Sequence, residues 1–269
     1  MSSACVLLHT AANGVATLTF DRPDLHNAID EATIAEFKAG LAKVAADPDV
    51  RVLVIAGNGK SFCAGADLNW MQRTADYDEA QNYRDALEFT ELLAALDTMP
   101  KPTIARVHGP AYGGGVGIVA ACDIALGTPQ AAFMFSEVRL GLVPAMISPY
   151  AVAAIGERHA RRYMLSAERI DAAEALRIGL LHEMCDAAEL DARIGKLVEQ
   201  MLRGGPESIA RSKALVARVA HGPIDTAMKD YTARTIAAVR AGSEGKEGIA
   251  AFLEKRLPAW VRPNEGAKR

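Results

Sequence analysis

The alternation of apolar and polar positions predicts strands and one helix in the first fifth of the chain. A β-rich run at 15–20 predicts a strand that ends before Pro23. Apolar residues then recur at helical spacing, at Ile34, Phe37, Leu41 and Val44. Asp30 precedes them as a possible N-cap. The apolar run at 51–57 predicts a strand buried on both faces, as in a parallel sheet.

The rest of the chain is predicted to contain further helices and strands. A helix is expected over about 80–96 and ends before Pro100, and a strand is expected over 103–108. The glycines at 113–115 open an Ala/Val/Ile helix, and a short strand returns at 123–126. From Pro206 onward the pattern is helical, with Ser243 as a possible cap of the last helix. The order predicts an α/β core over 1–200 and a C-terminal helical region over 201–269.

Composition and charge exclude several classes of protein. The formal net charge is −3, so no broad attraction to nucleic acid or anionic membrane is expected. The four cysteines have no Cys-x-x-Cys spacing and the six histidines no metal-binding spacing, so neither a metal nor a disulfide framework is expected. The N-terminus resembles neither a secretory signal nor a transit peptide, and no apolar run is long enough to span a bilayer. We therefore expect a soluble, cytoplasmic protein.

Several common catalytic motifs are incomplete. Gly59-Lys60-Ser61 resembles the end of a P-loop, but Val54 stands where its first glycine belongs. Ile118 stands where a dinucleotide fingerprint needs its third glycine, and no Gly-x-Ser-x-Gly elbow is present. Cys63 has no activating base in the sequence, and we interpret it as a small packed residue.

Two glycine-bearing segments follow predicted buried strands, at 62–68 and 111–117. Small residues there let a ligand approach the backbone, and the second segment also opens a helix whose free N–H groups favour negative charge. One N–H from each would form an oxyanion hole. The alternative is that the two segments are structural turns, and spacing alone favours this alternative.

Glu137 is a candidate acid–base residue, at the end of an apolar strand. Neighbours such as Phe135, Val138 and Leu140 would desolvate it and raise its pKa. An exposed loop glutamate is the alternative, and spacing alone favours it.

An ordered set of motifs resembles the crotonase family of enoyl-CoA hydratases and isomerases, over essentially the whole chain. The matching segments are RP…NA at 22–28, SFCAGADL at 61–68, GPAYGGG at 109–115, ACDI at 121–124, FSEVRLG at 135–141 and FLEKR at 252–256. The resemblance implies a spiral of β-β-α turns followed by helices that form trimers, which commonly pair into hexamers. It implies no cofactor, since coenzyme A is part of the substrate.

The resemblance also implies roles for individual residues. The amides of Ala66 and Gly114 would hold the thioester oxygen. Glu137 would carry the proton. The acyl-CoA ligands would be Ala64, Ala66, Asp67, Leu68, Asn69 and Gly114, with Phe252 and Lys255 reaching the nucleotide of coenzyme A on a neighbouring subunit. Pocket-wall candidates, each as easily core residues, are Trp70, Tyr112, Val116 and Leu142.

One departure from the family bears on the chemistry. Typical hydratases carry two glutamates, and Gly117 stands at the position of the first. In lacking the first glutamate and keeping the second, the sequence resembles some isomerases of the family. It also resembles a hydratase branch similar to the 3-methylglutaconyl-CoA hydratases of leucine breakdown. Our leading hypothesis is hydration of a 2-enoyl-CoA, with 3-methylglutaconyl-CoA as the candidate substrate. Arg139 or Arg106 are candidate partners of the free carboxylate of that substrate. Two alternatives stay open, a double-bond isomerase that uses one glutamate and an acyl-CoA-binding protein without catalysis.

Overall fold

The computed structural model describes residues 4–220 and 222–261. The chain forms two compact units. One comprises 1–99 and 103–195, and the other comprises 100–102 and 196–269. The division on the C-terminal side falls inside helix α7 (Leu190–Arg203).

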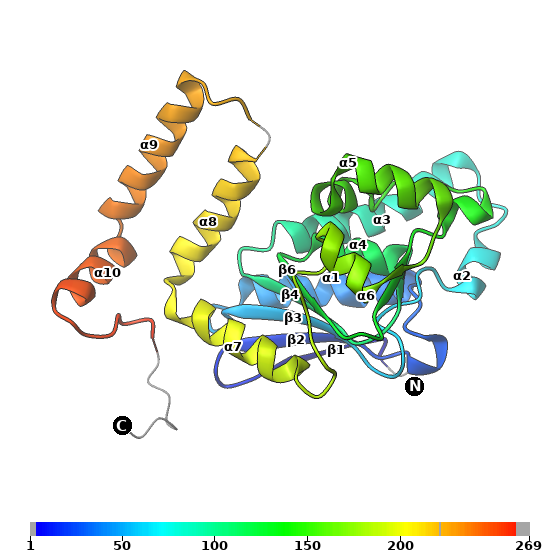
Figure 1. Cartoon of the computed structure of the whole chain (residues 1–269), viewed down its shortest axis with the longest axis horizontal. Helices are drawn as coiled ribbons and strands as arrows, with labels where there is room; N and C mark the ends of the chain where they lie inside the picture. The colour runs from blue at the N-terminus through cyan, green and yellow to red at the C-terminus, as the bar shows by residue number, and fades with distance from the viewer. Residues whose placement is uncertain (1–3, 221, 262–269) are drawn as a thin grey trace. The chain divides into compact units, whose positions relative to one another are not determined.

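The larger unit is built on a mostly parallel sheet (Figure 1). Its strands are β1 (Val6–Thr10), β2 (Val15–Phe20), β3 (Val52–Gly57), β4 (Thr103–Val107), β6 (Ile124–Gly127) and β9 (Glu183–Met184), paired in that order. Only the β1–β2 pair is antiparallel among these neighbours. Strand β3 is buried along its whole length, which fits its unbroken run of apolar side chains.

A second, smaller sheet carries the glycine cluster. Its strands are β5 (Ala111–Tyr112), β7 (Ala132–Met134) and β8 (Ile170–Asp171). Strand β5 pairs in parallel with β7, and β7 pairs antiparallel with β8. Because β5 is followed at once by a helix, the chain turns sharply at Gly113.

Helices connect these strands. They are α1 (Glu31–Ala46), α2 (Leu68–Arg73), α3 (Glu79–Asp97), α4 (Gly114–Ala121), α5 (Ser148–Ser166) and α6 (Ala172–Ile178), with 3-10 turns η1 (Pro23–Leu25) and η2 (Glu137–Leu140). The Asp30 side chain caps α1 by accepting from Thr33 N–H, as predicted. Helix α4 contacts both α3 and α5, so its apolar side chains are buried in the core of this unit.

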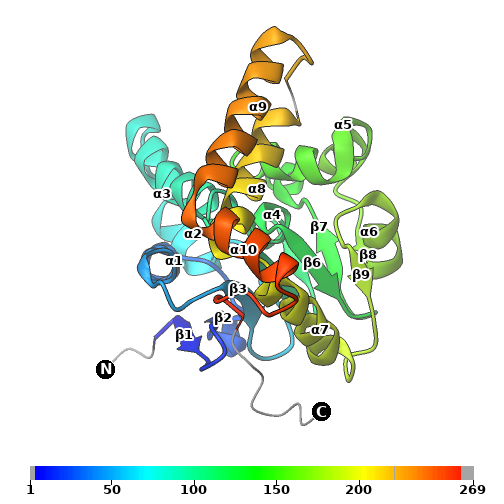
Figure 2. The same cartoon turned by 90° about the vertical axis from the view of Figure 1, so that its left-hand side faces the viewer.

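The regular elements among the described residues from 196 onward, in the smaller unit, are helices. After α7 come α8 (Pro206–Val219), α9 (Thr226–Ala241) and α10 (Ser243–Leu253), and α10 contacts both α8 and α9 (Figure 2). Pro206 is the first residue of α8, as expected. The expectation for Ser243 is wrong, because Gly242 is the N-cap and Ser243 already lies in the helix. Among the helices of residues 4–220 and 222–261, none is both long and apolar enough to cross a membrane.

The predicted fold class is confirmed, with an α/β core followed by helices. Strand β2 and the beginning of α1 match their predicted positions, and β3, β4 and α3 match to within a few residues. Strand β1 was not predicted, since its only neighbour is β2 and most of its residues are exposed. Its apolar residues therefore show no clear alternation of buried and exposed positions.

Candidate active site

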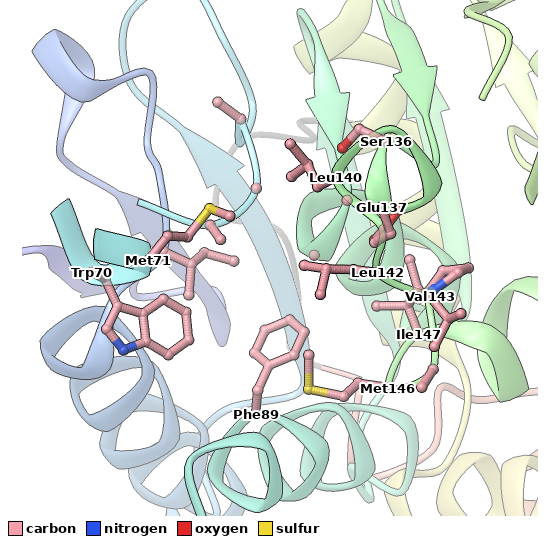
Figure 3. Close-up of a pocket in the computed structure, with 18 of the residues that line it drawn as sticks. Trp70, Met71, Phe89, Ser136, Glu137, Leu140, Leu142, Val143, Met146 and Ile147 are labelled. Carbon is pink, nitrogen blue, oxygen red and sulfur yellow. The ribbon is translucent and has the colours of Figure 1, made fainter. Parts of the chain in front are cut away.

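A cavity of about 280 Å³ lies within the larger unit. Figure 3 shows Trp70 and Met71 on one side of it and Glu137 and Leu142 on the other, with Phe89 and Met146 between them. The lining residues are Ile29, Ala64, Gly65, Ala66, Leu68, Trp70, Met71, Phe89, Gly113, Gly114, Ser136, Glu137, Leu140, Leu142, Val143, Pro144, Ala145, Met146 and Ile147. Within this set, drawn from the described part of the chain, Glu137 is the only side chain that ionises. An apolar chamber with one carboxyl group suits acid–base chemistry on an uncharged group.

The first wall of the cavity is the loop that follows β3. Gly65 adopts φ +92°, and a Cβ there would lie 3.0 Å from the carbonyl oxygen of Tyr112, so glycine is required. The Gly65 carbonyl accepts from Ile29 N–H at 2.7 Å, and Asp67 N–H donates to Ile29 O at 2.8 Å. The two peptide groups that flank Ala66 are thus fixed to the segment before α1.

This anchoring sets the direction of the Ala66 amide. The Gly65 carbonyl and the Ala66 N–H belong to one trans peptide, so they point in opposite directions. Since the carbonyl faces Ile29, the Ala66 N–H faces away from it. No hydrogen bond among residues 4–220 and 222–261 engages this N–H, so it is available as a donor.

The second donor comes from the beginning of α4. Gly113 adopts φ +47°, its N–H donates to Met134 O at 2.9 Å, and its carbonyl accepts from Val116 N–H at 2.9 Å. The Gly114 N–H points opposite to that carbonyl, away from the body of the helix. It has no partner in the described structure, and the helix dipole there favours negative charge.

The two loops are held side by side. Cys63 and Ala111 form a parallel bridge, and Tyr112 N–H donates to Cys63 O at 2.9 Å. A Cβ on Gly115 would lie 2.6 Å from that same oxygen, so glycine permits the close approach. These main-chain contacts join the two donor loops directly.

Glu137 lies beside the second loop, as the first residue of η2 rather than at a strand end. A Cβ on Gly113 would lie 3.4 Å from its Oε1, and its Oε2 is buried without a hydrogen-bond partner in the described structure. Burial raises the pKa of Glu137, and a hydrogen bond to its own backbone opposes this only in part. A carboxyl group with a raised pKa and a free oxygen is poised to exchange a proton.

The space beside Gly117 is filled by an apolar side chain. A Cβ on Gly117 would lie 2.8 Å from Ile147 Cβ and closer still to its Cγ2. Ile147 is buried and lines the cavity. The position at which the family resemblance leads us to expect a first glutamate therefore has no room for any side chain unless Ile147 moves.

Not every predicted ligand lines the cavity. Ala64, Ala66, Leu68, Gly114 and Glu137 do, as do the wall candidates Trp70 and Leu142. Asp67 and Asn69 do not, because the Asp67 side chain turns away to cap α2 and accepts from Asn69 N–H. Tyr112 and Val116 are also absent from the lining. Tyr112 lies in β5 and pairs with Met134 of β7, and Val116 of α4 is buried in the core.

Other expected groups lie elsewhere. Phe252 and Lys255 belong to the smaller unit and are exposed, so their role stays a prediction. Arg106 pairs with Asp191, and Arg139 donates to Ala167 O, so neither arginine lines the cavity. Burial raises the pKa of Cys63 to about 12, which leaves its thiol inert. The residues described contain no cluster of three metal-ligating side chains.

The residues that the sequence did not assign are mainly apolar walls from distant segments. Phe89 comes from α3, and Met146 and Ile147 directly precede α5. Their apolar character is indistinguishable from that of core residues along the sequence. Only the motif around 135–149, which also holds Glu137, marks the region as functional.

Comparison with known proteins identifies the family of the chain. The enoyl-CoA hydratase/isomerase family model matches residues 10–263. A crotonyl-CoA hydratase from Syntrophomonas wolfei is 34% identical over 92% of this chain and 94% of its own length. A trans-2-decenoyl-[acyl-carrier-protein] isomerase from Streptococcus mutans is 28% identical, over 95% and 97%. The crystal structure of an enoyl-CoA hydratase from Shewanella pealeana superposes with a TM-score of 0.93 at 43% identity, covering 95% of this chain and 96% of that one. The chain belongs to the enoyl-CoA hydratase/isomerase family, also called the crotonases.

Proposed function

We propose that this enzyme adds water to a 2-enoyl-CoA thioester, with Glu137 as its acid–base group. The observation that carries the proposal is the meeting of one buried, unpaired carboxyl oxygen with two unengaged amides on the wall of a single apolar cavity. A thioester enolate gathers negative charge on its oxygen. Two fixed donors in a site of low polarity stabilise that charge, and losing one typically costs roughly 3–4 kcal/mol of barrier.

The proton balance of the reaction needs one carboxyl group. The Glu137 carboxylate takes a proton from water as the water oxygen bonds to C3. The π electrons move to the thioester oxygen, between the amides of Ala66 and Gly114. The Glu137 carboxylic acid then protonates C2, the carbonyl re-forms, and the carboxylate is restored. Because position 117 is a glycine and supplies no second carboxyl group, Glu137 serves both transfers.

The more specific candidate substrate is 3-methylglutaconyl-CoA, an intermediate of leucine breakdown. It rests on the resemblance of the segments at 62–71 and 137–149. The apolar wall around Trp70 and Leu142 suits a methyl branch. The free carboxylate of 3-methylglutaconyl-CoA would find no cationic partner among the residues that line the cavity. We therefore propose that this carboxylate extends beyond the lining residues.

A double-bond isomerase is the second candidate, because one base and one oxyanion hole suffice to move a proton between C2 and C4. The isomerase among the relatives belongs to the same family. A third candidate is an acyl-CoA-binding protein without catalysis. It predicts acyl-CoA binding without turnover, and the same behaviour for the purified Glu137→Ala variant.

One assay separates these functions. Crotonyl-CoA, 3-methylcrotonyl-CoA, 3-methylglutaconyl-CoA and a 3-enoyl-CoA are each incubated with the enzyme, and loss of enoyl absorbance is followed with product analysis by NMR. Hydration of the 2-enoyl thioesters without a double-bond shift supports the proposal. A shift without hydration supports the isomerase, and a preference for 3-methylcrotonyl-CoA over 3-methylglutaconyl-CoA excludes the diacid as the main substrate.

We further propose that the enzyme works without a cofactor, in the cytoplasm, as a homotrimer or homohexamer. Phe252 and Lys255 would then reach coenzyme A bound to a neighbouring subunit. The exposure of Phe252, 81% of its surface, supports a role for this aromatic ring in contacts outside its own unit. Light scattering after size-exclusion chromatography measures the assembly, and a monomer contradicts it.

A further inference from the structure

We propose that Arg22 and Asp67 form a positioning pair that aims the Ala66 amide, with Arg22 offsetting the negative charge of Asp67 as the oxyanion forms. The proposal rests on the function proposed above. Neither residue lines the cavity, so they act through the backbone that does. Asp67 was expected to bind substrate, and this pair assigns it a different task.

A single guanidinium group joins the two segments that fix the donor peptide. Arg22 Nη1 donates to Ala28 O at 2.6 Å, and Nη2 lies 2.9 Å from Asp67 Oδ2 and 3.1 Å from Asp30 Oδ2. The segment at 28–30 carries Ile29, whose N–H and carbonyl bind the peptides on both sides of Ala66. Arg22 thus closes the ring of contacts that determines where the Ala66 N–H points.

Burial makes this pair sensitive to loss of one partner. The Arg22 side chain is 17% exposed, and that of Asp67 is 4% exposed. Breaking a buried pair from one side leaves an uncompensated charge, which costs far more than losing an exposed pair. The hydrogen bonds of Asp67 are otherwise complete, because its Oδ1 accepts from Asn69 N–H and Trp70 N–H.

The charge of Asp67 has a direct consequence for catalysis. Burial alone would raise its pKa, but the N–H groups of Trp70 and Asn69 together with Arg22 outweigh burial and lower it. Asp67 therefore stays negative, next in sequence to the amide that must stabilise a developing anion. Without Arg22 that charge would oppose the anion, and the reaction step would slow more than substrate binding.

Four variants test the pair: Arg22→Met, Arg22→Lys, Asp67→Asn and the double variant Arg22→Met/Asp67→Asn. Asn at 67 keeps the oxygen that caps α2 and removes the charge. The control is Arg106→Met, which breaks a more exposed ion pair with Asp191 in the same unit. Each variant is measured for kcat and KM of crotonyl-CoA hydration, for thermal stability, and for the infrared carbonyl frequency of bound butyryl-CoA.

We expect Arg22→Met to lower kcat by about tenfold or more while KM changes little, the scale of a small misplacement of a catalytic group. The bound carbonyl should shift to higher frequency, because a misaimed donor polarises it less. The double variant should recover only part of the lost kcat, since it removes the Asp67 charge next to the amide while the Asp30 charge remains. Arg22→Lys should fall between wild type and Arg22→Met, because an ammonium group lacks the planar fork.

Unchanged kcat and carbonyl frequency in Arg22→Met would overturn the proposal. A loss of stability and activity with an unshifted carbonyl, and with no recovery in the double variant, would assign the pair a structural role only. If Arg22→Met does not fold, Asp67→Asn and Arg22→Lys decide through the same two readouts. Butyryl-CoA cannot react, so its carbonyl shift tests the pair even if the wild-type enzyme fails to hydrate and the proposed function falls.

Discussion

The close packing of Gly117 against Ile147 makes Gly117→Ala a sensitive test of the site. The new methyl would lie 2.8 Å from Ile147 Cβ and closer to Cγ2, well inside van der Waals contact. Helix α4 and the segment before α5 must then separate, and overpacking of this kind costs about 1–3 kcal/mol. For a chain of this size, that lowers the melting temperature by roughly 2–4 °C for each kcal/mol.

The matched control is Gly195→Ala, the same change within helix α7. A Cβ there meets nothing within 4 Å, so the variant should be neutral or gain about 0.5–1 kcal/mol from helix propensity. Both variants are compared with wild type by calorimetry at one protein concentration, because assembly also raises stability. Equal melting temperatures for the two variants would refute the packing described for Ile147.

A double-variant cycle ties the loss to this contact. Ile147→Ala alone should cost about 2–5 kcal/mol, since the side chain is 2% exposed. In Gly117→Ala/Ile147→Ala the costs should fall short of additivity by about 1 kcal/mol, because removing Cγ2 relieves the closest contact of the new methyl while the contact with Cβ of residue 147 remains. Additive costs would show that the methyl strains some other contact.

Three further predictions concern the carboxyl groups. Glu137→Gln should lower kcat by about a hundredfold or more while acyl-CoA binding persists, measured by steady-state kinetics and calorimetric titration; full activity would remove Glu137 from the mechanism. Gly117→Glu, which restores the family's first glutamate, should lose activity and stability rather than gain a second base, because Ile147 occupies the space. Burial raises the pKa of Glu137, so kcat/KM should fall as the pH drops through a value above the ordinary glutamate range, and a flat profile there contradicts a carboxylate base.

The same pKa shift links Glu137 to folding. Between the ordinary and the raised pKa, the folded chain holds a proton that the unfolded chain has released, so stability falls as the pH rises through this window. Glu137→Gln removes that loss. The variant should melt above wild type at neutral pH, and the difference should disappear in acid.

Local signals made much of the fold predictable. Asp30 and Pro206 were assigned correctly because a cap and a first-turn proline depend on a few adjacent residues. The run at 52–57 could be recognised as a buried strand from its unbroken apolar character. Ser243 was misassigned because Gly242 immediately before it can also precede a helix, and one residue of register decides which is the cap.

The site was predictable where the sequence carries glycines and a lone glutamate, and less so elsewhere. Residues 113–115 and Glu137 are unusual in apolar surroundings, so they stand out. Ile147 looks like any core residue, and its contact with Gly117 joins positions with no local spacing. Asp67 lies inside a motif that predicts substrate binding, whereas its hydrogen bond with Arg22, far away in sequence, has no local signal.

The most direct test of the mechanism is a crystal structure of the enzyme with an unreactive acyl-CoA bound. The mechanism predicts that the thioester carbonyl oxygen lies within about 3 Å of the backbone N atoms of Ala66 and Gly114. It also predicts the Glu137 carboxyl group beside the carbons that correspond to C2 and C3. An oxygen bound elsewhere, or a carboxyl group turned away from those carbons, would contradict it.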